Sequence, residues 1–344
     1  MVALTHINFV TFGIVIFMTT FAHAQDMRKS DLFEDQNPLA IRMSVSLSEL
    51  RKKTNDSTYI PSMLSFKDGN RIWDSIPISI RTRGNFRKKH CAYPPLRIKM
   101  KKKDVVNTVF EGTKSLKLVL PCHEAKSNLD LINKEYVCYQ LYQPVSNYYF
   151  KTRLLDITLV EKGKRERTSR INGFFIEDDD QLAERHRSKV IDETKLNPMQ
   201  LEDTSALRFD LFQFMIANTD FSTTFFHNIK VVQTSNARYI PVPYDFDMSG
   251  IVNAPYATVD PKWEIKTVRE RVYKGYCRNE NLAQHVRKEF IGLEEEIYRI
   301  VGQHEELLTP KEAESLKKYL AEFFTILKDD IEYKEMITAK CRRP

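Results

Sequence analysis

The segment from Leu211 to Gly250 constrains this chain most, because it carries polar groups inside otherwise apolar sequence. These groups are the carboxylates Asp220, Asp245 and Asp247 and the carboxamide Asn228. A charge in an apolar environment is costly unless hydrogen bonds or a counter-ion compensate it. Phosphoryl-transfer enzymes hold magnesium against nucleotide phosphates with an Asp, an Asn a few residues on, and an Asp after the next strand. The segment therefore indicates either turn and cap residues or a metal site.

The spacing of the acidic residues favours the metal site. Asp245 and Asp247 lie two positions apart on an extended segment, so they share a face, and they repel each other unless a proton or a cation lies between them. Asp220 and Asn228 have a structural alternative, since Asp and Asn are common in turns and helix caps. We interpret His227 as a packed residue behind the site rather than a base.

The first residues predict export. Residues 1–24 contain an apolar run from Ile7 to Phe21, followed by the small-x-small sequence Ala22-His23-Ala24, which is typical of a removable signal peptide. The run is shorter than the roughly 20 residues that span a bilayer. We therefore expect a periplasmic, extracellular or surface protein with no stable membrane span. The polar residues 25–39 are expected to form a flexible leader.

Composition limits the partners. The chain has a formal charge of +7, and its basic residues gather at Arg81–Lys89, Arg97–Lys103 and Lys162–Arg170, which suits phosphates or an acidic partner. A nucleic-acid-binding protein would have denser basic patches interleaved with aromatic residues, so we expect no nucleic-acid partner. The five cysteines include no CxxC pair, which argues against a zinc site, and their odd number leaves at least one thiol free.

The pattern of apolar residues divides the chain in two. Strand-like alternation recurs between residues 40 and 177, with a helical stripe at Asn128–Tyr142, and predicts an antiparallel-sheet lobe with one helix. Residues 178–344 are mainly helical in pattern, so the predicted fold class is α+β. The stretches with strand-like alternation are Ile41–Leu47, Ser75–Arg83, Leu96–Lys101, Leu116–Leu120, Leu155–Leu159 and Ile171–Ile176. The later helical stretches are Ala206–Ala217, Asn281–Val301 and a helix opened by the capping box Thr309-Pro310-Lys311-Glu312.

One strand has a strongly basic face. Arg97, Lys99 and Lys101 alternate with apolar residues, so they point to the same side. This face is either a solvated surface or a wall that faces phosphates. The acidic run Glu177–Asp180 is interpreted as a solvated connector between the lobes, whose backbone could meet an adenine ring.

Four motifs in order resemble the CotH family, the atypical kinases named for a spore-coat protein. The resemblance covers about residues 75 to 250 and implies a two-lobed, protein-kinase-like fold that binds ATP with Mg²⁺ or Mn²⁺. The motifs are Arg81-Thr82-Arg83-Gly84-Asn85, Tyr93-Pro94-Pro95-Leu96-Arg97-Ile98-Lys99, Asn218-Thr219-Asp220 with His227-Asn228, and Ile240-Pro241-Val242-Pro243-Tyr244-Asp245-Phe246-Asp247.

The resemblance also implies roles for single residues. On the nucleotide side, Lys99 would contact the phosphates as a catalytic residue, oriented by Glu135, while Arg81 and Arg83 would cover the phosphates. The backbone at Glu177, in the connector, is the part expected near the nucleotide's adenine. On the metal side, Asn228 and Asp245 would hold magnesium with help from Asp247. Asp220 would take the position of the catalytic acid.

The chain departs from ordinary protein kinases in several ways. It has no glycine-rich G-x-G-x-x-G loop and no His-Arg-Asp triplet, and Asp-Phe-Asp replaces Asp-Phe-Gly. The first hypothesis is therefore an exported atypical kinase that transfers the γ-phosphoryl group of ATP to protein Ser or Thr. The alternative is a non-catalytic, pseudokinase-like envelope or surface binding protein. A metal-dependent phosphohydrolase ranks last, because the sequence lacks a His-rich ligand set.

Overall fold

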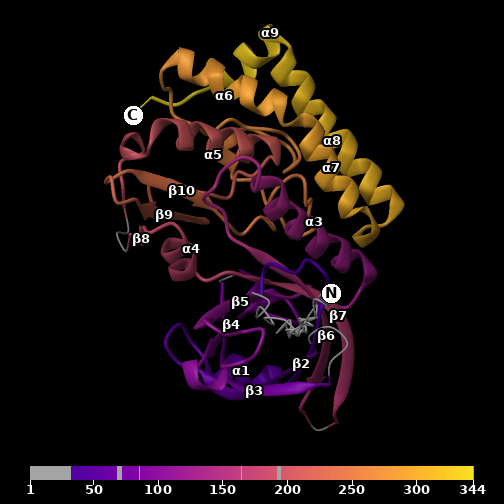
Figure 1. The fold of residues 1–344 in the computed structure, drawn as a ribbon. Coiled ribbons are helices and arrows are strands. Elements are labelled where there is room, and N and C mark those ends of the chain that lie inside the picture. The colour runs from indigo at the N-terminus through magenta and orange to yellow at the C-terminus, as the bar shows by residue number, and fades with distance from the viewer. Residues whose placement is uncertain (1–31, 68–71, 85, 164, 192–194, 344) are drawn as a thin grey trace, which may run out of the picture.

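The computed structural model describes residues 32–67, 72–84, 86–163, 165–191 and 195–343. Figure 1 shows a strand-rich N-terminal half below a mainly helical C-terminal half, so the predicted α+β class is confirmed. The export signal predicted at residues 1–24 lies outside the described residues. None of the described helices is both long and apolar enough to cross a bilayer.

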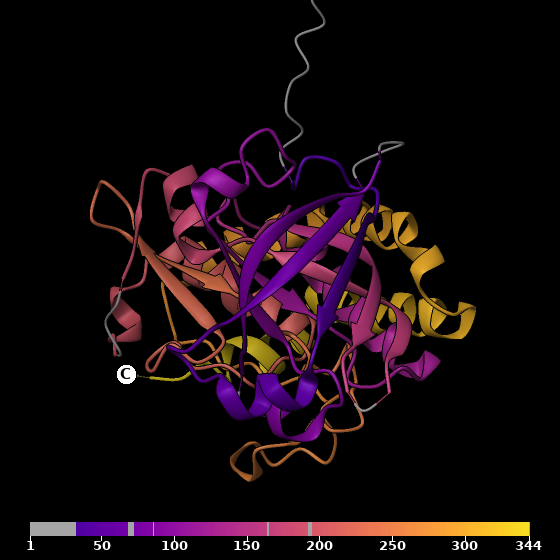
Figure 2. The same cartoon turned by 90° about the horizontal axis from the view of Figure 1, so that it is seen from below.

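The N-terminal half is a closed barrel of seven strands in the order β1-β2-β3-β4-β5-β7-β6. Neighbouring strands are antiparallel, except that β1 pairs with β6 in parallel and closes the barrel. Figure 2 shows the N-terminal strands from below. The strands are β1 (Leu39–Val45), β2 (Ile60–Lys67), β3 (Asp74–Thr82), β4 (Leu96–Met100), β5 (Ser115–Val119), β6 (Thr152–Glu161) and β7 (Arg167–Ile176).

This half differs from the predicted antiparallel-sheet lobe, because the sheet closes into a barrel through the parallel β1–β6 pair. Each strand turns an apolar face inward, and Ile41, Ile98 and Phe175 are fully buried in the resulting core. Closing the sheet buries these faces against one another and removes the exposed strand edges. Two short helices, α1 (Leu47–Lys53) and α2 (Phe86–His90), join the strands of the barrel.

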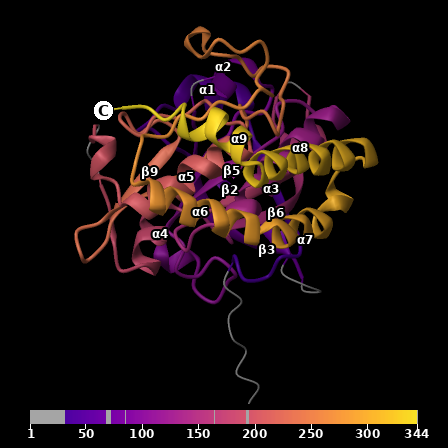
Figure 3. The same ribbon diagram turned by 90° about the horizontal axis from the view of Figure 1, so that it is seen from above.

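The C-terminal half surrounds a second core, to which α3 of the first half contributes Tyr136 and Tyr139. Seen from above, α6, α7 and α8 lie over α3 and α5 (Figure 3). A small antiparallel sheet, in the order β10-β9-β8, faces the barrel side. The helices are α3 (Lys126–Tyr142), α4 (Asp179–Arg185), α5 (Asp203–Met215), α6 (Glu280–Gly292), α7 (Glu294–Gln303), α8 (Pro310–Lys328) and α9 (Asp330–Tyr333), and the strands are β8 (Lys189–Val190), β9 (Ile229–Gln233) and β10 (Tyr239–Pro243).

Two disulfides fasten segments near the ends of these elements. Cys91–Cys122 joins the residue after α2 to the segment after β5, and Cys277–Cys341 joins the loop before α6 to the C-terminal segment. Cys138 is a buried free thiol. The pairing therefore agrees with the odd cysteine count and leaves one thiol inside the core.

The segment before β1 is part of the barrel core, so the flexible leader expected at residues 25–39 is wrong for its described part. Leu32 and Phe33 are buried. Arg153 of β6 donates to the Leu32 carbonyl at 3.1 Å and pairs with Asp35 at 2.8 Å. The burial of Leu32 and Phe33 in the barrel core and the contacts of Arg153 together hold this polar stretch in place.

Replacing Leu32 with Ala should therefore destabilise the protein. Truncating a buried leucine typically costs about 2–5 kcal/mol. The check is the urea midpoint of unfolding, with Glu34→Ala as the control because Glu34 is exposed in the same turn. Equal midpoints for the two variants would show that this segment contributes nothing to the fold.

Candidate functional site

A cleft of about 490 Å³ lies between the barrel and the C-terminal half. This is within the size range of small-molecule sites. The cationic side chains that line it are Arg83, Arg87, Arg97, Lys117 and Lys230, and the acidic and amide side chains are Glu135, Asp179, Asp220, Asn228, Asp245 and Asp247. All but one of the cations come from the barrel, whereas Asp220, Asn228, Asp245 and Asp247 come from the C-terminal half. The cleft thus has one basic wall and one acidic wall.

The β9–β10 hairpin brings Asn228 and Asp245 together. Asn228 precedes β9 and Asp245 lies just beyond β10, and the register pairs Ile229 with Pro243. Because the strands are antiparallel, the residues before β9 and after β10 meet at the same end of the hairpin. The Tyr244 N–H donates to the Asn228 carbonyl at 3.2 Å, which extends the pairing by one step.

The backbone at both residues is in the left-handed region, with φ of 53° at Asn228 and 64° at Asp245. Asn and Asp tolerate this conformation better than other side chains do. The Asp245 N–H donates to the buried Tyr139 hydroxyl of α3 at 2.9 Å, so the helix fixes this strained peptide. Left-handed non-glycine residues that the surroundings hold in place are concentrated at functional sites.

Asp220 is held by hydrogen bonds on several sides. Its N–H donates to Asn218 Oδ1 at 3.0 Å, and Asn228 Nδ2 donates to its carbonyl at 2.8 Å and to its Oδ2 at 2.9 Å. His227 Nε2 lies 3.0 Å from Asp220 Oδ1, and this hydrogen bond raises the pKa of His227. The structure therefore brings Asp220 and Asn228 into direct contact, and His227 lines the cleft beside them rather than lying packed behind it.

Lys274 is an unpredicted residue of this region. Its buried Nζ donates to the Thr219 carbonyl at 2.6 Å and to the Phe221 carbonyl at 2.7 Å. Burial lowers its pKa to about 7. Through its two hydrogen bonds, Lys274 Nζ binds the peptide groups on both sides of Asp220. Nothing in the local sequence signals this contact, because it joins loops that are far apart in the chain.

The loop that carries Lys274 is fastened to the C-terminal segment. Besides the Cys277–Cys341 disulfide, Arg342 N–H donates to the Gly275 carbonyl at 2.8 Å, and Cys277 N–H donates to the Arg342 carbonyl at 2.9 Å. A Cβ at Gly275 would lie 2.6 Å from a carboxylate oxygen of Asp210, so only glycine allows this close approach. The position of Asp220 thus depends indirectly on the end of the chain.

The basic wall follows from the register of the barrel. Arg81 pairs with Arg97 across β3 and β4, and Arg97 pairs with Lys117 across β4 and β5. All three point away from the barrel core, because the residues that alternate with them, such as Leu96 and Ile98, are buried inside. Lys117 lies closest to the C-terminal half, and its side chain is almost fully buried. Lys117 is not among the residues predicted for the site.

The acidic run after β7 neutralises this wall. Asp178 pairs with Arg97, while Asp179 pairs with Lys117 and, at 2.9 Å, with Lys230 of β9. Burial alone would raise the pKa of Asp179, but the two ammonium groups outweigh burial and hold it below its ordinary value. The solvated connector expected at Glu177–Asp180 is therefore wrong, because Asp178 and Asp179 form buried or half-buried ion pairs.

Three predicted residues lie outside the cleft. Lys99 Nζ lies 4.6 Å from the ring centroid of Tyr59, and Arg81 Nε donates to the Tyr59 hydroxyl at 3.1 Å. Residues two apart on a strand are separated by roughly 6.7 Å, which takes Lys99 past the end of the cleft that Arg97 reaches. Glu177 instead accepts a hydrogen bond from Arg185 at 2.9 Å. Lys99, Arg81 and Glu177 are therefore not among the residues that line this cleft.

Glu135 pairs with Arg87 rather than with Lys99, the cation that the resemblance implied. It is buried on α3, and its Oε2 lies 3.3 Å from Arg87 Nη1, which is also 3.9 Å from Asp247 Oδ2. Burial raises the pKa of Glu135 to about 8, and burial together with the Asp245 carboxylate raises the pKa of Asp247 to about 7. Arg87 belongs to the basic run after β3 but is not among the residues predicted for the site.

Two charged residues of the cleft have no ion-pair partner in the described part of the chain. They are Arg83, on the basic wall, and Asp245, on the acidic wall. Each other charged lining residue is paired with a neighbour. An unpaired cation and an unpaired anion facing one cleft indicate a ligand that carries both signs of charge.

The acidic wall fits magnesium better than it fits a metal held by protein alone. Among the described residues, no group of three or more His, Cys, Asp and Glu side chains is placed to hold a metal ion. Magnesium needs only one or two carboxylates when phosphate oxygens complete its shell. Asp245 and Asp247 would supply these carboxylates. The amide oxygen of Asn228 is the atom left to bind a cation, because its nitrogen donates to Asp220.

Comparison with known proteins adds little to this geometry. No protein-family model and no curated protein sequence matches the chain. Among solved structures, the crystal structure of the Helicobacter pylori proinflammatory kinase CtkA is similar to 72% of this chain and 90% of its own, with 11% identity and a TM-score of 0.34. A likeness of this size carries no weight in assigning a fold family or an activity.

Replacing Lys274 with Met should loosen the loop around Asp220. The carbonyls of Thr219 and Phe221 would lose a charged donor, and we expect amide hydrogen exchange over residues 219–228 to rise by about tenfold or more. Amides of β3 and β6 serve as the internal reference and should not change. Lys274→Arg keeps a donor and should show a smaller effect. Equal exchange in wild type and Lys274→Met would contradict the role assigned to this lysine.

Replacing Asp210 with Asn should alter the pH dependence of stability. Burial raises the pKa of Asp210 to about 7, against the attraction of Arg278 and Arg342. Its folded pKa exceeds its unfolded value near 3.8, so its contribution is fully present below that value and is lost as the pH rises through about 7.

From about pH 4 to pH 8, wild type should therefore lose on the order of a few kcal/mol that the Asn variant does not lose. Thermal unfolding of both proteins across this range measures the difference. Glu314→Gln, at an exposed position, should follow wild type. Parallel curves for wild type and Asp210→Asn would refute the prediction.

Proposed function

We propose that this chain is a CotH-like atypical kinase that binds ATP with Mg²⁺ or Mn²⁺ and transfers the γ-phosphoryl group to protein Ser or Thr. The observation that carries the proposal is the cleft with Arg83 unpaired on one wall and Asp245 unpaired on the other. Phosphoryl transfer depends mainly on positioning and charge neutralisation, which such a cleft supplies. The two-lobed, kinase-like arrangement and export from the cell belong to the same proposal.

Under this proposal the walls divide the work. Arg83 lies on the phosphate side and neutralises the transferred group. Lys117, whose charge is already paired with Asp179, contacts the phosphates in the place that the resemblance gives to Lys99. Asn228, Asp245 and Asp247 would hold the divalent ion, which would supply charge neutralisation for the phosphates. Glu135 holds Arg87 in position beside Asp247.

Asp220 faces the acceptor hydroxyl in this scheme. The hydroxyl oxygen forms a bond to the γ-phosphorus, the bond from phosphorus to the β–γ bridging oxygen breaks, and ADP leaves with that oxygen. The proton of the hydroxyl passes to the Asp220 carboxylate. Asn228 holds Asp220 by hydrogen bonds to its carbonyl and carboxylate oxygens. Lys274 binds the carbonyls of the residues on either side of it.

A non-catalytic nucleotide-binding protein is the second candidate, and one observation favours it. Both carboxylate oxygens of Asp220 already have partners, Oδ1 in His227 and Oδ2 in Asn228. A base with both oxygens occupied accepts a proton less readily than a free one. Incubation with γ-labelled ATP and casein as acceptor separates the two, because only the kinase labels protein.

Replacing Asp245 with Ala should abolish metal-dependent nucleotide binding with little loss of fold. A ligand at 100 times its Kd stabilises wild type by about 2.7 kcal/mol, so ATP with Mn²⁺ should raise the Tm of wild type and not that of the variant. Lys117→Met should also reduce the shift, whereas Lys99→Met is the matched control and should retain it. A full shift in Asp245→Ala, or loss of the shift only in Lys99→Met, would overturn the assignment.

A further inference from the structure

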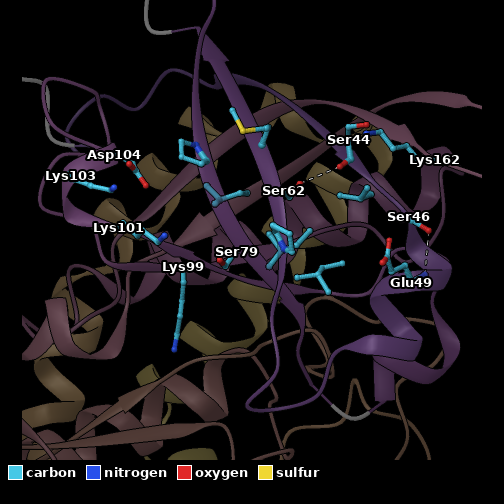
Figure 4. A pocket seen from close by; sticks show the side chains of 17 residues that line it. Ser44, Ser46, Glu49, Ser62, Ser79, Lys99, Lys101, Lys103, Asp104 and Lys162 are labelled. Atoms are coloured by element: carbon cyan, nitrogen blue, oxygen red, sulfur yellow. Dashed lines mark hydrogen bonds between the residues drawn. The ribbon is translucent and has the colours of Figure 1, made fainter.

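A second cavity, of about 630 Å³, lies on the outer surface of the barrel (Figure 4). It shares no lining residue with the cleft described above. It crosses from β4 over β3 and β2 to the end of β1, and small side chains line its middle, including Pro61, Ser62, Pro77 and Ser79. We call it the barrel groove. Its course across four strands and its serine hydroxyls suit an extended chain better than a compact ligand.

Four lysines line the barrel groove beside its apolar and serine side chains. Lys99, Lys101 and Lys103 lie along one side, and Lys162 lies on the other (Figure 4). Within the described part of the chain, none of the four forms an ion pair, although Lys99 rests on the Tyr59 ring. Their charge is therefore available to a ligand.

Among the residues that the structure describes, two carboxylates line the barrel groove. Glu49 is neutralised by Lys53 at 2.6 Å. Asp104 is the second carboxylate of the lining. One remaining acidic side chain against four lysines leaves the groove positively charged.

The basic side of the barrel groove leads toward the cleft. Arg97, Lys99 and Lys101 project from the same face at the β4 strand, and Arg97 lines the cleft whereas Lys99 and Lys101 line the groove. Alternate residues on a strand are about 6.7 Å apart, which is also the spacing of alternate side chains on an extended peptide. Carboxylates at every second position of such a peptide would match these cations in register.

We propose that the barrel groove binds an extended acidic segment of the protein substrate and thereby presents a neighbouring Ser or Thr to the cleft. This inference rests on the proposed kinase function and assigns its substrate class. A nucleic acid fits less well, because no described residue that lines the groove is aromatic, and single strands bind largely by stacking their bases on aromatic rings. An acidic peptide needs only cations and backbone hydrogen-bond partners.

The test is direct binding of a fluorescein-labelled peptide of alternating Glu and Ser, followed by fluorescence anisotropy without nucleotide. The double variant Lys101→Glu/Lys103→Glu should bind about tenfold more weakly, since two attractions become two repulsions. Lys311→Glu/Lys318→Glu is the matched control, with the same change of net charge at exposed positions on α8. It should bind like wild type. Lys162→Glu, from the opposite side of the groove, should also weaken binding.

Two results would overturn the inference. One is equal loss of affinity in the groove variant and in the α8 control, which would mark non-specific attraction. The other is tighter binding of a single-stranded oligonucleotide of equal charge than of the acidic peptide. The groove variant should keep the Tm shift with ATP and Mn²⁺. If ATP with Mn²⁺ gives no Tm shift in wild type, the kinase proposal fails. The peptide titration contains no nucleotide, so it tests the groove separately.

Discussion

The carboxylate of Asp179 ties the two halves of the molecule together, and the rest of the site depends on this tie. It forms ion pairs with Lys117 from the barrel and with Lys230 from the β9–β10 hairpin. Removing charges from water is costly, and a buried ion pair repays that cost only with good geometry and further partners. Two cations that share one carboxylate meet this condition. The shared contact therefore sets the separation between the barrel wall and the hairpin that carries Asn228 and Asp245.

Much of the fold follows from local sequence patterns. Alternation predicts β3 and β4 closely, and the proline-containing box predicts the start of α8 at Pro310. The second strand escapes prediction because Pro61 and two serines interrupt the apolar alternation of Ile60–Lys67. Closure of the barrel escapes as well, since the parallel pairing of β1 with β6 joins residues far apart in sequence. No local pattern encodes such a contact.

The same division holds within the site. Asp220, Asn228, Asp245 and Asp247 can be found from the sequence because polar groups inside an apolar stretch are a local signal. Among the cations, Arg83 was predicted and lines the cleft. The cation of β4 cannot be chosen, because Arg97, Lys99 and Lys101 are equivalent by alternation, and only the strand register and the position of the C-terminal half decide which one reaches the cleft. Lys117 and Lys274 are hidden for a similar reason. Each is a buried lysine whose partners lie on distant segments.

The electrostatics of the cleft explain why the proposal needs a nucleotide and a divalent ion together. The connector already neutralises Arg97 and Lys117, so the basic wall offers mainly Arg83 to a new anion. On the opposite wall, Asp245 is held in a strained backbone by Tyr139, and burial together with the Asp245 charge raises the pKa of Asp247. A polyanion alone would relieve Arg83 but would be repelled by the carboxylates, and a cation alone would do the reverse. A metal–polyphosphate complex satisfies both walls, so each component should strengthen the binding of the other.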